Sequence, residues 1–491
     1  MKWGDKLADK IRNWLQINPP YAGHMLPIRG STTMDEEIIR NRVWYRGDSD
    51  ELLQLYERDS RTDASSSRFW AAVPAGRKIR KIHSGLPGMM VDTLVGIVSG
   101  DFDGIDFDDV TTASRFEEIN RSVHLSDQMT DALTECLITG DGAFKLSWDK
   151  ALSEHPIVDF YGADRVEYHY TRNLLTGISF YTNFNGQDQV YQLEEIYSAG
   201  SIRYALRNHK GITVPLDTVP ELRDYKNIEL PNNLMAAVPL TLFRGGRWPH
   251  RGRSLFAGKT DTFDALDEVI SQWIDAIRAG RVIKYIPENM IPRDKNTGAL
   301  QMPDSFGGEY VKVAGTMDAE KSDGKIDLKQ PDIRYDAFLA SYTATLDMCL
   351  QGVLSPATLG IGIAKTASGE AQRERKDITG FTRNTITAVL ERALPKLATV
   401  ILQLDDYISG KSIGTYNPTV SFGEYASPDF ASRAKAVQSA AASGAMSIEA
   451  TVEELWGGSK GDDWIADEIA RIKKERGVAE VSEPSAADEL P

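Results

Sequence analysis

The sequence predicts a mixed α+β protein of several domains, on three observations. Its 491 residues, 41% of them hydrophobic, can bury a substantial core and fill about three domains. Apolar side chains recur at helical spacing up to about residue 140 and again in the second half of the chain. Between these parts, residues 144–243 contain runs in which apolar and polar side chains alternate as they do in strands.

At the N-terminus, residues 1–30 are expected to form an amphipathic helical arm, because apolar side chains recur there at helical spacing. Asp5 and Asp9 interrupt the apolar run that a secretory signal would need. Nowhere do about eighteen apolar residues follow one another, so no membrane span is expected. Cys136 and Cys349 both lie in apolar segments and are predicted to be buried free thiols.

The central region is predicted to be a β meander. Residues 178–184 and 190–197 have strand character and are joined through Asn185 and Gly186, a pair typical of hairpins. A third strand is expected at 202–206. A further strand-like run ends before a loop rich in Gly and Arg at 244–253.

Two amphipathic helices are predicted to bracket a small insertion. The first covers 260–279, with an apolar face that includes Trp273, and ends at Gly280. The second covers 335–353. Between them, 282–333 contains short strand-like runs separated by turn residues, which predicts a β-containing insertion.

The first of these helices also carries an acidic stripe, formed by Asp261, Asp264, Glu268 and Asp275. Such a stripe is either a solvated face or a surface that faces a channel or a neighbouring subunit. We predict that Trp273 lies in a contact between subunits.

After the second helix, residues 354–367 are predicted to form an ordered loop without helix, because Pro356, Gly360 and Gly362 oppose helix formation. Ser368 is the expected N-cap of a long helix that Pro395 should kink.

Beyond residue 424, the pattern predicts a small helical domain at 425–477. The final residues, 478–491, are rich in Glu, Ser, Ala and Pro and are expected to be disordered.

Motifs for catalysis and metal binding fail on spacing. Gly258, Lys259 and Thr260 end like a P-loop, but five residues, rather than four, separate them from Gly252. The acidic run at 101–109 departs from the EF-hand register and is expected to be a solvated loop. The histidines and cysteines show no metal-ligand spacing. We therefore expect no enzymatic activity and no cofactor.

The net charge of -15 argues against a protein that grips phosphate backbones. It is compatible with a conduit, whose acidic wall would keep a DNA duplex from adhering.

Several local sequences, in their order along the chain, resemble the portal, or head-to-tail connector, proteins of long-tailed double-stranded-DNA bacteriophages. The matching segments are NRVWYRG at 41–47, RFW at 68–70, ITGDGAFK at 138–145, VPLTLF at 238–243, GRS at 252–254, ASGEA at 367–371 and SGAMSIEATVEEL at 443–455. The resemblance spans roughly residues 40–475, most of the chain.

The resemblance implies a portal-type fold with named parts. These would be a mixed α/β wing at 31–254 to which a long kinked helix at 368–424 returns, stem helices at 255–281 and 334–353, a clip at 282–333, a tunnel loop at 354–367 and a helical crown at 425–477. The tunnel-loop residues expected to face DNA are Gly360, Ile361, Gly362, Ile363, Lys365 and Thr366.

The function implied is a ring, by resemblance a dodecamer, at one capsid vertex of the virion, assembled in the host bacterial cytoplasm. DNA would pass through the ring during packaging and ejection without sequence recognition. Implied partners are the terminase, the major capsid and scaffolding proteins and the head-tail connector proteins, with no membrane. The alternatives are a terminase-like packaging ATPase and nuclease, or another capsid structural protein.

Overall fold

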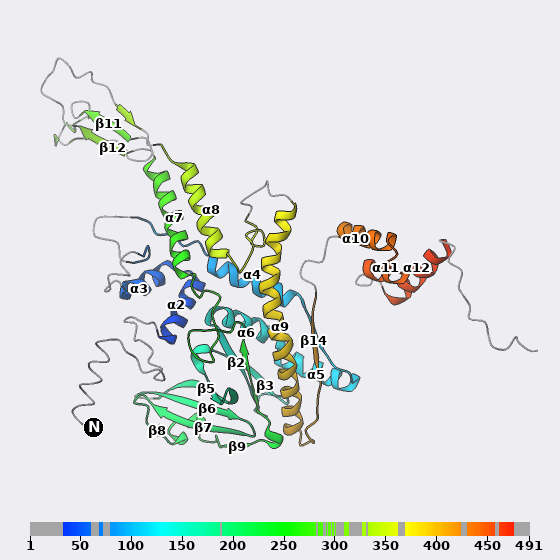
Figure 1. Ribbon diagram of the computed structural model, residues 1–491. Coiled ribbons are helices and arrows are strands. Elements are labelled where there is room, and N and C mark those ends of the chain that lie inside the picture. Colours follow the sequence, from blue (N-terminus) through cyan, green and yellow to red (C-terminus); the bar gives the residue numbers. More distant parts are fainter. Residues whose placement is uncertain are drawn as a thin grey trace, which may run out of the picture. The chain divides into compact units, whose positions relative to one another are not determined.

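The computed structural model describes residues 33–59, 68–71, 79–186, 189–280, 283–287, 291, 293–295, 297–298, 300, 309–313, 327–329, 332–361, 369–423, 430–456 and 461–475. The predicted arm at 1–30 and tail at 478–491 lie outside these residues, as does most of 282–333. The fold is mixed α/β (Figure 1). The chain divides into two compact units, Met1–Phe422 and Gly423–Pro491.

Five helices open the described part of the first unit. They are α2 (Met34–Arg46), α3 (Ser49–Asp59), α4 (Leu86–Gly100), α5 (Val110–Val123) and α6 (Leu125–Thr139). Helix α2 begins with a capping box, in which Thr33 and Glu36 satisfy each other's backbone N–H groups, and ends at Gly47 in the left-handed conformation. Trp44 is fully buried and donates a hydrogen bond from Nε1 to the Tyr56 hydroxyl of α3 (3.0 Å).

Two antiparallel sheets follow in the sequence. The smaller has the strand order β10-β2-β3, from Ala237–Thr241, Asp141–Ser147 and Ile157–Gly162. The larger contains β4 (Val166–Thr171), β5 (Leu174–Asn185), β6 (Val190–Ser198), β7 (Ser201–Asn208), β8 (Thr213–Val214) and β9 (Ile228–Glu229), in which β9 pairs with β7. The hairpin predicted at Asn185 and Gly186 is confirmed, since β5 and β6 pair up to Asn185 and Val190.

The acidic segment predicted to be a loop at 101–109 is instead largely a strand. Strand β1 (Phe102–Asp106) pairs antiparallel with β14 (Thr419–Phe422), and Asp109 caps α5 through its side chain. Asp101 forms an ion pair with Arg383 of α9 (3.0 Å). The strand backbone and the Asp101 carboxylate therefore have partners far away in the sequence, whereas Asp109 acts locally.

Three long helices complete the first unit. Helix α7 (Thr260–Ala279) matches the predicted 260–279, and α8 (Tyr335–Leu350) ends somewhat earlier than predicted. Helix α9 (Gly369–Ile408) contains Pro395; the kink expected there remains a prediction. Strands β11 (Ile283–Pro287), β12 (Glu309–Val313) and β13 (Asp327–Lys329) form a small sheet between α7 and α8 in the sequence.

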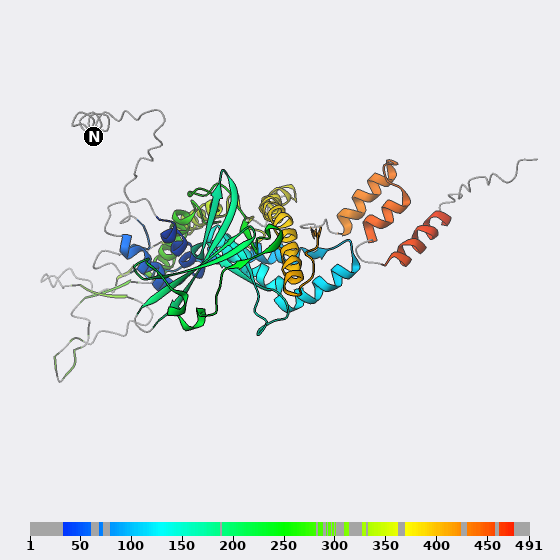
Figure 2. The ribbon, with the colours of Figure 1, turned by 90° about the horizontal axis from the view of Figure 1, so that it is seen from below.

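In its described residues, the second unit contains the helices α10 (Phe430–Ala442), α11 (Ile448–Trp456) and α12 (Asp462–Glu475) (Figure 2). Trp456 and Trp464 pack edge to face, and Lys473 pairs with Glu449 (2.7 Å). In the described residues, no helix is long and apolar enough to cross a membrane. Both cysteines are free and buried, as predicted.

The loop at 244–253 is fixed to the smaller sheet by Arg251. Its guanidinium donates to both carboxylate oxygens of Asp141 (2.9 and 2.8 Å) and to the carbonyls of Val166 and Ala163. The backbones meet at Gly252, where a Cβ would lie 2.1 Å from the Gly140 carbonyl oxygen. Two segments of the family resemblance, at 138–145 and 252–254, thus form one junction.

Arg251→Ala should lower the free energy of unfolding by about 3–5 kcal/mol, because it leaves the buried Asp141 carboxylate without its cation. Arg247→Ala, in the same loop at an exposed position, should change it by less than about 0.5 kcal/mol. Urea unfolding followed by tryptophan fluorescence measures both. Equal effects of the two substitutions would contradict the anchoring role.

Candidate functional site

The candidate site is the antiparallel helix pair α7–α8 and its base, where the pair joins the rest of the first unit (Figure 1). At the base, Lys259 donates from Nζ to the Gln351 carbonyl (3.0 Å), near the carboxyl end of α8. Lysine at this position satisfies carbonyl groups that the end of a helix leaves without partners. The two helices are thereby tied together where they enter the body.

Further along the pair, Trp273 of α7 packs against three aromatic rings of α8. Its ring centroid lies 6.2 Å from that of Phe338, in parallel orientation, 5.9 Å from that of Tyr335 and 6.4 Å from that of Tyr342. These contacts of Trp273 lie within its own chain, and its place in a contact between subunits stays a prediction. An aromatic pair of this kind contributes about 0.5–1.5 kcal/mol beyond the area buried.

Two buried carboxylates anchor the base of α7. Asp264 accepts hydrogen bonds from the backbone N–H groups of Phe69 (2.8 Å) and Trp70 (3.1 Å). Burial raises the pKa of Asp264, and these two amides oppose the shift. Asp264 thus holds the RFW segment of the family resemblance.

Asp267, one turn further along, has no exposed surface. It accepts hydrogen bonds from Trp70 Nε1 (3.0 Å) and from the Ser84 backbone N–H (2.8 Å), and its carboxylate lies 2.7 Å from His83 Nδ1. Sequence reasoning missed both Asp267 and His83.

The acidic stripe is consequently shorter than predicted. Asp264 does not belong to it, because its carboxylate points into the body. Asp261, Glu268 and Asp275 follow at intervals of seven residues, close to two helical turns, and share one face of α7. Asp261 is largely exposed and lies 3.2 Å from Arg68, and Glu268 accepts a hydrogen bond from Gln272.

The first part of the predicted loop at 354–367 is a turn that docks on α9. The Ser355 backbone N–H donates to Thr379 Oγ1 (2.9 Å), and the Thr382 hydroxyl donates to the Val353 carbonyl (2.7 Å). Gly360 has a φ of 71°, which favours glycine. Ile361 is partly buried and packs against the core, and the expectation that it faces DNA stays a prediction.

The other residues that were predicted to face DNA, Gly362, Ile363, Lys365 and Thr366, lie outside the described residues.

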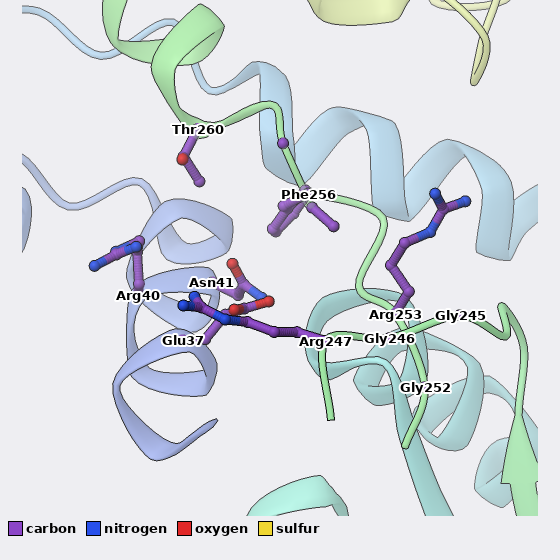
Figure 3. A pocket seen from close by; sticks show the side chains of 12 residues that line it. Glu37, Arg40, Asn41, Gly245, Gly246, Arg247, Gly252, Arg253, Phe256 and Thr260 are labelled. Atoms are coloured by element: carbon purple, nitrogen blue, oxygen red, sulfur yellow. The ribbon is translucent and has the colours of Figure 1, made fainter. Parts of the chain in front are cut away.

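A cavity of about 360 Å³ lies between α2, the loop at 244–253 and the start of α7 (Figure 3). Arg40, Arg247 and Arg253 line it. Figure 3 shows the Arg247 side chain extending toward Glu37, whereas Arg253 points the opposite way. Because the guanidinium groups do not converge, this cavity lacks the geometry of a phosphate site.

The lysine that ends the P-loop-like sequence is occupied structurally. Lys259 Nζ lies on the α8 carbonyls, and burial lowers the pKa of Lys259. Within the described ranges, no three His, Cys, Asp or Glu side chains gather as they would around a metal ion.

Comparison with known proteins gives no family assignment. No protein-family model matches the chain, and no curated protein matches it. Among solved structures, one chain of "Virion of native gene transfer agent (GTA) particle" is similar, with a TM-score of 0.41 and 10% identity over 91% of this chain and 96% of that one.

A chain of "Neck of native GTA particle computed with C12 symmetry" aligns with a TM-score of 0.36 and 11% identity over 78% of this chain and 89% of that one. A chain of "Neck of empty GTA particle computed with C6 symmetry" aligns with a TM-score of 0.36 and 10% identity over 79% of this chain and 90% of that one. With TM-scores this low, none of these likenesses carries an argument about this chain.

Asp267→Ala should release the base of α7, because it leaves three donors at Trp70, His83 and Ser84 without their acceptor, at a cost of about 3 kcal/mol or more. Hydrogen exchange followed by mass spectrometry should show faster exchange at 82–86. Asp275→Asn, on the same helix at a half-exposed position, should leave that exchange unchanged. Protection at 82–86 that survives in Asp267→Ala would refute the anchor.

Proposed function

We propose that this chain is a portal-type subunit, which assembles into a ring at one vertex of a phage-like capsid and lets double-stranded DNA pass through the centre. In this proposal α7 and α8 are the stem, the β11–β13 insertion is the clip, the segment after Leu354 is the tunnel loop and α10–α12 form the crown. The ring would dock a terminase during packaging and connector proteins afterwards.

The observation that carries the proposal is the exposed face of α8. Ala337, Ala340, Ala344 and Met348 are exposed along one side of α8, and Met348 is 54% exposed. The exposed Asp336 and Asp347 flank this strip of small and apolar side chains. Water covers this apolar face in a single subunit, which is unfavourable by about 25 cal/mol per Å². A neighbouring helix would bury it, and the small alanines would permit close packing.

The two helices present different surfaces, which suits a ring better than a two-fold dimer. One side of α7 carries Asp261, Glu268 and Asp275, whereas α8 exposes alanines and Met348 between Asp336 and Asp347. In a cyclic assembly each subunit offers two different faces to its two neighbours, and the contact closes on itself. If the acidic face lines the channel, it repels the DNA phosphates and lets the duplex slide.

A terminase-like ATPase finds no support in the geometry of the P-loop-like sequence. A phosphate-binding lysine must be free to reach the β- and γ-phosphates. Lys259 is instead held by the carboxyl end of α8.

Ala340→Glu should reduce ring formation, because it places an unpaired charge in the proposed contact between neighbouring helices. We expect the fraction of protein in rings to fall by about tenfold or more. Native mass spectrometry measures the oligomers. Ala450→Glu, the same change at an exposed position of α11, is the control and should assemble normally. If both variants assemble like the wild type, the α8 interface is wrong.

Deletion of residues 362–364 should leave ring assembly intact while changing packaging or retention of DNA, because the docked turn before them is kept. Lys365→Ala should have the same effect, more weakly, since one contact to phosphate is modest and screened by salt. DNase-protected DNA is measured in a packaging reaction with the matching terminase. If the deletion variant packages and retains DNA normally, the proposed role of this segment in the channel is wrong.

A further inference from the structure

A second cavity, of about 770 Å³, lies between the two sheets of the first unit. Its walls come from β2, β3, β6 and β7, from the turn that follows β2 and from residues 224–228. Cavities of about 300–1,000 Å³ are typical of sites that bind small molecules or side chains. The proposed function makes no use of this cavity.

Its floor is an ion pair that bridges the two sheets. Lys145 Nζ of β2 donates to Glu195 Oε2 of β6 (2.7 Å) and to the Tyr161 hydroxyl (3.0 Å). Both charged side chains are nine-tenths buried. Burial acts to lower the pKa of Lys145, but Glu195 and Tyr161 outweigh it and keep the amine charged. The cation of the floor is therefore already neutralised.

The walls are aromatic and acidic. The rings of Trp148, Tyr197, Tyr204 and Tyr225 line the cavity, and the Tyr204 and Tyr225 rings meet edge to face at 5.1 Å.

Asp159 projects from β3 into this lining, half-buried. Asp159 is the cross-strand neighbour of Lys145, whose amine bonds instead to Glu195 and Tyr161. In the described part of the chain no hydrogen bond or ion pair of the Asp159 carboxylate is found, so it is free to accept from a group outside the chain.

We propose that this cavity binds a guanidinium group, in the form of an arginine side chain of a partner protein. Aromatic faces attract cations and repel anions, and a planar guanidinium stacks on rings while it bonds a carboxylate with two N–H groups. At the mouth, Leu152 and Tyr225 are 77% and 41% exposed and suit the aliphatic stem of the side chain.

Two lysines also lie at this cavity, Lys150 and Lys226, but both are exposed. Solvent and salt screen exposed charges, whereas the half-buried Asp159 is screened less. The overall charge of -15 further favours a cationic ligand. The site is thus selective for positive charge.

The test uses N-acetyl-arginine methylamide as the probe and N-acetyl-citrulline methylamide, which has the same shape without the charge, as its matched control. Binding to the full chain is measured by calorimetric titration. We expect saturable binding of the arginine probe and about tenfold or more weaker binding of the citrulline probe.

Asp159→Asn should weaken the affinity for the arginine probe by about tenfold without changing the melting temperature of the protein. Glu453→Gln, at an exposed position of α11, should change neither the affinity nor the melting temperature. The Lys145–Glu195 pair is left intact because its loss would disturb the fold. Equal binding of both probes, full binding by Asp159→Asn, or no saturable binding up to the solubility of the probe would each overturn the proposal.

Discussion

Burial of two carboxylates in the first turns of one helix is the constraint on which the rest of this structure depends. Asp264 and Asp267 cannot stay inside the protein without donors, since an unpaired buried charge costs several kcal/mol. Their donors are the backbone and side chains of 68–71 and 82–84. The base of α7 is therefore fixed to the start of α4. Because Lys259 and the aromatic rings around Trp273 join α7 to α8, the whole helix pair is held by that base.

The second fixed point is the junction of Gly140 and Gly252, with Arg251 on Asp141. It aligns the loop before α7 with the smaller sheet, so the helix pair leaves the body from two rigid supports. A rigid base gives a functional reason for an exposed α8 face. A helix that holds its direction can present small apolar side chains to a neighbour in a defined register. Association then loses little conformational entropy, because the helix is already ordered.

Local sequence patterns were sufficient to predict most of the helices and strands. The apolar face and Gly280 predicted α7 at its observed bounds, and Asn185 with Gly186 predicted the hairpin of β5 and β6. Patterns failed where the partner is remote in the sequence. Asp264 looks like one more acidic residue on a helix face, and only a segment almost 200 residues earlier explains its burial. The acidic run at 102–106 becomes a strand because β14, more than 300 residues later, pairs with it. For the same reason the cavity above Lys145 and Glu195 and the contact of the RFW segment with α7 could not be predicted.

In the proposed assembly, subunits associate through their helix pairs into a closed ring with an open centre. Negative-stain electron microscopy of the purified wild-type chain tests this arrangement through class averages of single particles. We expect rings with cyclic symmetry and a central hole, with the helix pairs packed side by side around the hole. Compact monomers, two-fold dimers or closed shells as the dominant species would contradict it.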